Sequence, residues 1–301
     1  TAVGVNALLA NTTGTRNVAL GALALDANTT GDKNIAIGMD ALGTNVDGSR
    51  SVAIGDSALA TQDPASAVDM YNTAVGHGAG SAVTTGTANT FIGGRAGDAT
   101  TTGSTNTAIG TDALGANTTA SNNVAVGYDC LVANTTGDLN VAVGTSALTA
   151  NTTGNRNVAI GNLALDANTV GDRNVAIGVA ALGTFNPASN ADTYNVAIGY
   201  DAGFGMTTGA SNICIGGFAG DDITTGSNNT FLGYDSTSGS PSGTNRIVLG
   251  WTTVGTGNAH FTFGQGSGSD RVYNAFQSNA SWTRVSDQRY KEEITDNTDC
   301  G

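Results

Sequence analysis

Few side chains in this 301-residue chain could take part in acid–base, nucleophilic or metal chemistry. The two histidines, His77 and His260, have no Cys, Asp or Glu nearby at the spacing of metal ligands. Glycine-rich stretches such as 93–97 belong to a sequence repeat, and no strand–loop–helix pattern of a phosphate-binding loop surrounds them. The repeat region therefore predicts no catalytic site, no metal site and no cofactor.

The three cysteines indicate neither a disulfide framework nor a metal site. Cys130 and Cys214 stand where the other repeats have alanine, and Cys300 stands alone near the end of the chain. Free cysteine is commonly a small buried residue, so we expect Cys130 and Cys214 to lie in the core.

Two long segments, 61–71 (TQDPASAVDMY) and 184–194 (TFNPASNADTY), carry residues suited to ligand binding. They match each other across 123 residues, which suggests duplication of a larger block. Lengthened surface loops with Asp and Tyr can contact a ligand. The alternative is that both are tolerated bulges. The candidate contacts are Asp63, Tyr71, Asp192 and Tyr194.

The long segments interrupt a repeat that organises most of the chain. A motif of the form N-[V/I/T]-[A/F]-[I/V/L]-G recurs, with twelve of its fourteen spacings equal to 17 residues and two equal to 21. Such regular self-similarity predicts stacked coils that bury apolar residues against their neighbours. The closing glycines are Gly4, Gly21, Gly38, Gly55, Gly76, Gly93, Gly110, Gly127, Gly144, Gly161, Gly178, Gly199, Gly216, Gly233 and Gly250.

Each repeat predicts a short strand and a turn. With residues 17–33 numbered as places 1 to 17, places 2 and 4 are apolar and point to one face of a strand. Place 3 is mostly alanine, so we expect the opposite face to pack closely as well, against a partner chain. Ala-Leu or Ala-Gly at places 8 and 9 predicts a second short strand, and the following Asn-Thr-Thr-Gly predicts a turn. The glycine at place 5 indicates a positive φ or a contact too tight for a Cβ.

Asparagine recurs at place 1. Stacked coils would bring its amides into register, so we expect a structural hydrogen-bond ladder; a polar binding row is the alternative. The ladder includes Asn17, Asn34, Asn106, Asn123, Asn140, Asn157 and Asn174.

Composition excludes several functions. Glycine makes up 44 residues, aromatic residues only 6 % and charged residues 12 %, about half the globular norm, so the core must be narrow. A net charge of −13 argues against nucleic-acid binding. No apolar run is long enough to cross a membrane, and we expect no insertion into one. The chain opens at Thr1 in mid-repeat, which suggests a fragment.

The repeat ends at Gly250. Residues 251–286 contain strand-like aromatic pieces, and charge then becomes dense in 286–294, SDQRYKEEI. This junction resembles the start of the peptidase S74 intramolecular chaperone domain of bacteriophage tail fibres and tailspikes, with the pattern S-D-x-R-[L/Y]-K-x-x-I. We therefore divide the chain into a repeat shaft (1–250), a β-rich tip (251–286) and the truncated start of a chaperone domain (287–301).

The resemblance implies a trimeric fibre whose chaperone cuts itself off before the aspartate. Ser286 would be the nucleophile, Lys291 its activating base and Ser286–Asp287 the scissile bond, in line with the chemistry of a desolvated neutral lysine. The alternative is a helix start capped by Ser286. Apart from this single self-cleavage, the implied protein is not an enzyme.

The repeats are also similar, over about residues 1–250, to the head of YadA-like trimeric autotransporter adhesins, whose units are typically shorter. Together the patterns predict an all-β β-roll or β-solenoid of 17-residue units, intertwined as a homotrimer. The expected function is a phage tail-fibre shaft in the virion. Its expected partners are two further copies of itself, a host receptor or glycan, and other tail proteins.

Two alternatives remain open at the level of sequence. The first is the head of a bacterial adhesin on the outer surface of a cell. The second, more remote, is an ice-binding solenoid that uses the threonine pairs of the turns, such as Thr29-Thr30 and Thr152-Thr153.

Overall fold

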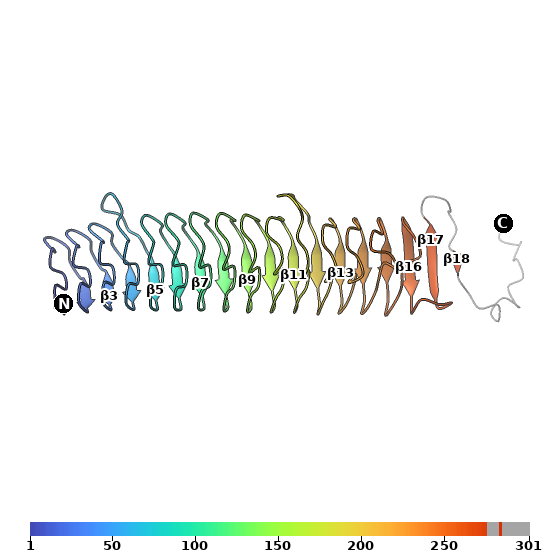
Figure 1. The fold of residues 1–301 in the computed structure, drawn as a ribbon, viewed down its shortest axis with the longest axis horizontal. Helices are drawn as coiled ribbons and strands as arrows, with labels where there is room; N and C mark the ends of the chain where they lie inside the picture. Colours follow the sequence, from blue (N-terminus) through green and yellow to red (C-terminus); the bar gives the residue numbers. More distant parts are fainter. Residues whose placement is uncertain (276–282, 285–301) are drawn as a thin grey trace, which may run out of the picture.

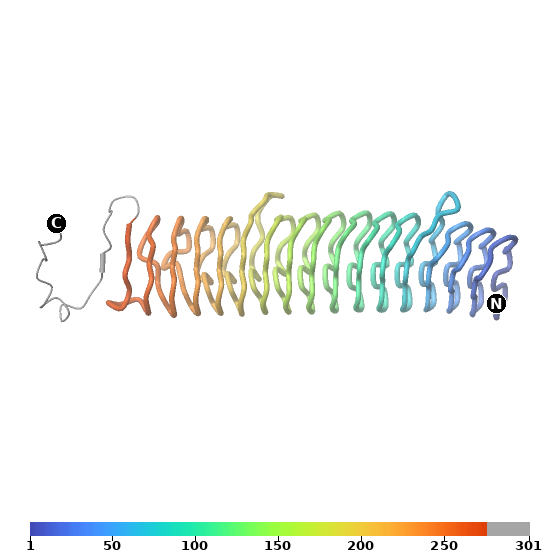
Figure 2. The backbone as a smooth tube through the Cα atoms, turned by 180° about the vertical axis from the view of Figure 1, so that it is seen from behind, coloured from blue at the N-terminus to red at the C-terminus, as the bar shows by residue number. Residues whose placement is uncertain are grey.

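The computed structural model describes residues 1–275 and 283–284, which form one long, all-β solenoid (Figures 1 and 2). Each repeat makes one coil, and its strand pairs in parallel with the strands of the coils before and after it. The register advances by 17 residues per coil, as from Val18 to Ile35, and by 21 where a coil is longer, as from Val52 to Thr73. The prediction of a β-solenoid with 17-residue repeats is confirmed.

The strands of the repeats are very short. They are β1 (Ala2–Val3), β2 (Val18–Leu20), β3 (Ile35–Ile37), β4 (Val52–Ile54), β5 (Thr73–Val75), β6 (Thr90–Ile92), β7 (Thr107–Ile109), β8 (Val124–Val126), β9 (Val141–Val143), β10 (Val158–Ile160), β11 (Val175–Ile177), β12 (Val196–Ile198), β13 (Ile213–Ile215), β14 (Thr230–Leu232) and β15 (Ile247–Leu249). They coincide with the strand that places 2 to 4 predicted.

Among the described residues, three further strands follow the repeats. β16 (His260–Gly264) adds to β15 in parallel, and β17 (Arg271–Ala275) then pairs antiparallel with β16. β18 (Thr283–Arg284) pairs antiparallel with β17. The parallel stack thus changes into an antiparallel meander at its carboxyl end.

The second strand predicted at places 8 and 9 is not formed. This part of each coil is a run of turns, because places 7 and 9 have a left-handed backbone: φ is 52° at Asp129 and 53° at Leu131. Residues in this conformation cannot extend a strand. Each coil therefore closes through turns around a single strand of three residues.

Alanine and leucine fill the core. Ala142 at the centre of β9 and Leu148 at place 9 are fully buried, and their equivalents in other coils are buried in the same way. The alanine face, which we expected to meet a partner chain, is therefore the inner face of this chain's own coil. The branched residues of places 2 and 4 point outward instead, and 47 % of Leu20 and 38 % of Ile160 are exposed. A coil with one strand has only one inner face, and it is too narrow to hold branched side chains there as well.

The cysteines Cys130 and Cys214 lie in this core, as predicted, and burial raises the pKa of both thiols to about 12. In a Cys300→Ser variant we expect neither thiol to react with Ellman's reagent at pH 8, because the thiolate is the reactive form. Both should react once the chain is denatured. Rapid labelling of the folded protein would show that the coils open easily.

Candidate functional site

The two long loops, 61–71 and 184–194, are the places where the shaft departs from its 17-residue repeat. In Figure 1 both project beyond the other coils, in blue and in yellow, on the same side of the shaft. They belong to the coils of β4 and β11, which are seven coils apart. At the usual spacing of neighbouring strands, this separation is about 34 Å.

At the first loop, Asp69 and Tyr71 form a closed cluster with Arg50 of the preceding coil. Arg50 Nε lies 2.7 Å from Asp69 Oδ1, and the Tyr71 hydroxyl donates a 3.1 Å hydrogen bond to Asp69 Oδ2. The Arg50 guanidinium lies 5.7 Å from the centroid of the Tyr71 ring, within the range of a cation–π contact. We call this arrangement the Arg–Asp–Tyr cluster.

The second loop forms the same cluster. Arg173 and Asp192 make an ion pair through Nη1 and Oδ2, and the Tyr194 hydroxyl donates to Asp192 Oδ2 over 3.0 Å. The Arg173 guanidinium lies 5.6 Å from the centroid of the Tyr194 ring. Residues at equivalent places thus make the same three pairwise contacts, although the arginine uses Nε in the first cluster and Nη1 in the second.

The repeat itself positions these residues. Arg50 and Tyr71 both occupy the last place of a coil with a positive φ, 62° and 54°, so the two side chains stand one coil apart on the same edge. An isolated parallel bridge between Ser49 and Asp69 fixes the aspartate beside them, and Asp172 and Asp192 form the equivalent bridge in the second loop. The clusters therefore rest on the backbone of the shaft.

The chemistry of the cluster favours binding over catalysis. The hydrogen bond to Asp69 raises the pKa of the Arg50 guanidinium, which is charged at neutral pH even without this contact. A carboxylate held by both arginine and tyrosine is poorly placed to act as a general base. The tyrosine rings remain accessible, with 57 % of Tyr71 and 52 % of Tyr194 exposed, and offer an aromatic surface and a hydroxyl.

Of the four predicted loop contacts, the structure brings Asp192 and Tyr194 together and places Tyr71 in the matching cluster. Asp63 lies elsewhere, where its Oδ1 accepts a 3.4 Å hydrogen bond from the Val46 amide. The residue equivalent to Asp192 is Asp69, as alignment of the two long segments shows. Sequence reasoning also missed Arg50 and Arg173, although basic residues recur at place 17.

The row of asparagines at place 1 forms a buried ladder. Asn140 Oδ1 accepts a 2.9 Å hydrogen bond from the backbone amide of Asn157 in the next coil, and Asn140 Nδ2 donates a 2.8 Å hydrogen bond to the Gly154 carbonyl. Asn17, Asn34, Asn106, Asn123, Asn157 and Asn174 are buried too. Because the amides are inaccessible, the row stabilises the coils and cannot bind a ligand from solution.

A second amide ladder, at place 12, was not predicted. Asn151 Nδ2 donates to Asn134 Oδ1 in the preceding coil over 2.8 Å, and Asn168 Nδ2 donates to Asn151 Oδ1 over 3.1 Å. The recurrence of asparagine at this place was visible, but we assigned it to turn geometry alone. The two ladders meet at a shared acceptor, since the Gly154 carbonyl accepts from both Asn140 Nδ2 and Asn151 Nδ2, and together they hold neighbouring coils in register.

The autocleavage residues Ser286 and Lys291 and the Ser286–Asp287 bond lie outside the described residues, as does Cys300. Within the described part of the chain, no group of three His, Cys, Asp or Glu residues could hold a metal ion. The same residues contain no helix long and apolar enough to span a membrane.

Comparison with known proteins identifies no family. No protein-family model matches the chain, and no curated protein matches it. The similarities to phage fibres and to adhesin heads therefore rest on the repeat and on the SDQRYKEEI segment.

Proposed function

We propose that the chain is the shaft of a homotrimeric phage tail fibre, which holds receptor-binding groups away from the virion. The observation that carries this proposal is the exposed apolar face of the solenoid. The outward residues of places 2 and 4 follow one another along the sheet through the parallel register, as Val143, Ile160 and Ile177 do. We call the apolar outward residues of β2 to β15 the apolar strip; place 2 is threonine in β5, β6, β7 and β14.

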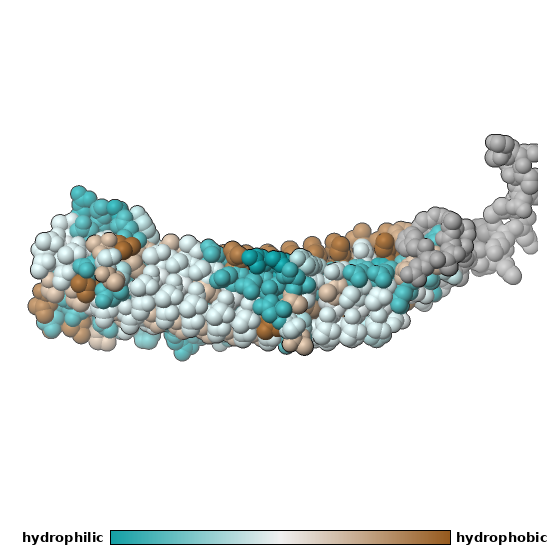
Figure 3. All heavy atoms as spheres, turned by 90° about the horizontal axis from the view of Figure 1, so that it is seen from above, coloured by the Kyte–Doolittle hydropathy of each residue, from teal (hydrophilic) through white to brown (hydrophobic). Residues whose placement is uncertain are grey.

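An apolar strip of this length is unusual on the surface of a soluble monomer, where large contiguous patches generally mark interaction sites. Figure 3 shows hydrophobic residues gathered along one margin of the shaft. The strip runs along the length of the shaft, so its natural partner is another copy with the same repeat and the same shape. Three copies around a common axis would cover all three strips, and the long loops would then stand on the outer surface.

The trimer is tested by its mass. Light scattering of the purified chain is expected to give three times 29.8 kDa. An Ile109→Lys, Ile160→Lys double variant should shift the mass toward that of the monomer, because both charges would enter the covered strip. A Thr102→Lys, Thr136→Lys double variant, which adds the same two charges at exposed places of turns, should remain trimeric. A monomeric parent chain, or equal behaviour of all variants, would overturn the proposal.

The two Arg–Asp–Tyr clusters support receptor recognition by the same fibre. Exposed tyrosine supplies contact area at low cost in conformational entropy. A trimer would carry six clusters, so that weak contacts add to a strong attachment. Binding of the labelled chain to host cells should fall when Tyr71 and Tyr194 are both changed to alanine, and unchanged binding would remove the loops from this role.

The proposed fibre matures by cutting off its own carboxyl-terminal chaperone domain. In the full-length gene product we expect the chain to be cut between Ser286 and Asp287, with Ser286 as nucleophile and Lys291 as base. Mass spectrometry should find the cut product from the native gene and only the uncut chain from Ser286→Ala. Identical cut products from both would exclude this assignment.

A further inference from the structure

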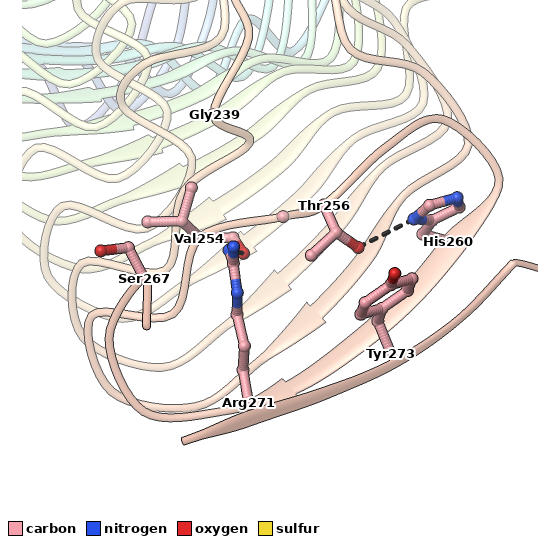
Figure 4. A pocket seen from close by; sticks show the side chains of 8 residues that line it. Gly239, Val254, Thr256, His260, Ser267, Arg271 and Tyr273 are labelled. Carbon is pink, nitrogen blue, oxygen red and sulfur yellow. Dashed lines mark hydrogen bonds between the residues drawn. The ribbon is translucent and has the colours of Figure 1, made fainter. Parts of the chain in front are cut away.

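A cavity of about 390 Å³ opens at the carboxyl end of the shaft (Figure 4). Its walls come from the last coils and from the first two strands of the meander, β16 and β17. Its volume is in the range of small-ligand sites in proteins. The side chains that line it include Val254, Thr256, His260, Ser267, Arg271 and Tyr273.

Arg271 supplies the charge of the cavity. Its Nη1 donates a 2.5 Å hydrogen bond to the Val254 carbonyl, which anchors the guanidinium against one wall. Its Nε is buried and has no hydrogen-bond partner among the described residues. A buried donor without a partner costs free energy, and a bound acceptor would recover it. The planar guanidinium is suited to a carboxylate, which can accept two parallel hydrogen bonds.

The opposite wall is flat and aromatic. Tyr273 stands two residues from Arg271 on β17, and its ring stacks on the His260 imidazole with centroids 5.3 Å apart and planes within 10°. The Thr256 hydroxyl and His260 Nδ1 lie 2.8 Å apart and form the hydrogen bond drawn in Figure 4. A ring-shaped ligand could pack against this wall while hydroxyl groups of Ser267 and Tyr273 bond to its polar atoms.

The charges around the cavity favour an anion. Burial, together with the positive charge of Arg246, lowers the pKa of His260, so the imidazole is neutral at pH 7 and the lining charge comes from Arg271. The half-buried carboxylate of Asp222 has both oxygens engaged by the backbone amides of Ser238 and Gly239 at 2.8 and 2.7 Å, and Asp270, the chain neighbour of Arg271, is exposed to solvent. A carboxylate that enters the cavity would therefore meet hydrogen-bond donors and little repulsion from other negative charges.

We propose that this cavity binds the carboxylate of an acidic monosaccharide unit, with Arg271 as the anion contact and the His260–Tyr273 stack as the wall for the sugar ring. The inference deepens the proposed receptor-binding function by naming a ligand class. All lining residues belong to one chain, so the cavity can bind even if the chain is not trimeric. Failure of one proposal is thus distinguishable from failure of the other.

The two histidines make a direct test possible. In the 301-residue chain with ¹³C-labelled imidazoles, titration with sodium D-glucuronate should shift the His260 signal in a saturable way and leave that of the exposed His77 unchanged. D-glucose lacks the carboxylate and acetate lacks the ring, so both should bind at least tenfold more weakly.

Arginine variants test whether Arg271 is the residue that binds the carboxylate. Arg271→Gln should weaken glucuronate binding by tenfold or more, whereas Arg156→Gln, the same change at an exposed site on the shaft, should have no effect. If Arg271→Gln disturbs the meander, Arg271→Lys keeps the charge and loses only the planar fork, and a clear weakening is still expected. Equal binding of glucuronate and glucose, undiminished binding to both Arg271 variants, or the absence of a saturable His260 shift would overturn the proposal.

Discussion

Replacing Gly93 with alanine should destabilise the shaft by about 3 kcal/mol or more, whereas the same change at its neighbour Gly94 should be neutral or slightly stabilising. Gly93 closes one repeat motif and has a φ of 137°, a conformation that side chains of L-residues rarely adopt. A Cβ built there would lie 2.5 Å from the Gly110 carbonyl oxygen of the next coil. That oxygen belongs to the stacked backbone and cannot move without separating the coils.

Gly94 provides a matched control one residue away. A Cβ built on Gly94 meets no atom within 4 Å, and its φ is not in the positive range. The two variants have the same composition, so their difference isolates backbone geometry. We would compare denaturation midpoints by circular dichroism and hydrogen exchange in the coils of β6 and β7, because repeat proteins can unfold locally. Equal midpoints and equal exchange would show that the close approach at place 5 can relax.

The recurring glycine explains why the coil architecture could be predicted from the sequence. It does not show which face of the strand points into the coil. An invariant glycine at a fixed interval signals a backbone constraint, and the structure shows that constraint as contact between successive coils. Which face of a three-residue strand points inward depends on the width of the coil. Alternation of apolar residues and alanine is compatible with either orientation, and only the closed coil shows that alanine is inside.

The packing of the core is a second feature that the sequence alone did not explain. Place 9 is leucine in most coils and glycine in others, which sequence periodicity alone does not explain. In the structure, the Phe91 ring occupies the space where side chains of Gly80 and Gly97 would lie, since built Cβ atoms there fall 2.7 and 2.4 Å from ring atoms. The coils of β14 show the same exchange between Phe231 and Gly220. Phenylalanine at place 3 thus occupies space that leucine at place 9 fills elsewhere, both in its own coil (Gly97) and in the preceding coil (Gly80, Gly220).

The candidate sites differ in how far sequence could locate them. The long loops were evident from their length and mutual similarity, but the Arg–Asp–Tyr clusters depend on arginines from the preceding coil. The cavity at Arg271 forms only where β17 turns back on β16, so residues in the last coils and the meander come together across the end of the sheet. No spacing rule predicts such a meeting, because the repeat has already ended there.

The asparagine ladder leads to the second large expected effect. Changing Asn140 to alanine should cost about 2 kcal/mol, because the buried Asn157 amide would lose its partner, while the Gly154 carbonyl would keep only its hydrogen bond from Asn151 Nδ2. Asn162→Ala removes an exposed asparagine whose amide donates to the Thr145 carbonyl, and we expect a change within about 0.5 kcal/mol. Denaturation midpoints of the two variants provide the comparison.

One coil of the chain already lacks asparagine at place 1. Ser51 stands there, and Gln62 at place 12 brings a side-chain amide beside it: Gln62 Oε1 accepts a hydrogen bond from the Ser51 hydroxyl over 3.2 Å and one from the side-chain Nδ2 of Asn72, in the next coil, over 2.9 Å. Gln62 Nε2 also continues the second ladder by donating to Asn45 Oδ1 over 2.9 Å. The longer side chain therefore serves both ladders at once.

Transplanting this pair tests whether the two ladders are coupled. Asn140→Ser alone should destabilise the shaft by about 2 kcal/mol, and adding Asn151→Gln in the same coil should recover at least half of that loss. Asn151→Gln by itself should not stabilise the chain, because Asn140 already occupies the space that the longer amide would enter. A double variant whose destabilisation equals the sum of the two single changes would mean that each ladder acts independently. Recovery would show that the amide at the centre of the coil, rather than asparagine at one fixed place, holds successive coils in register.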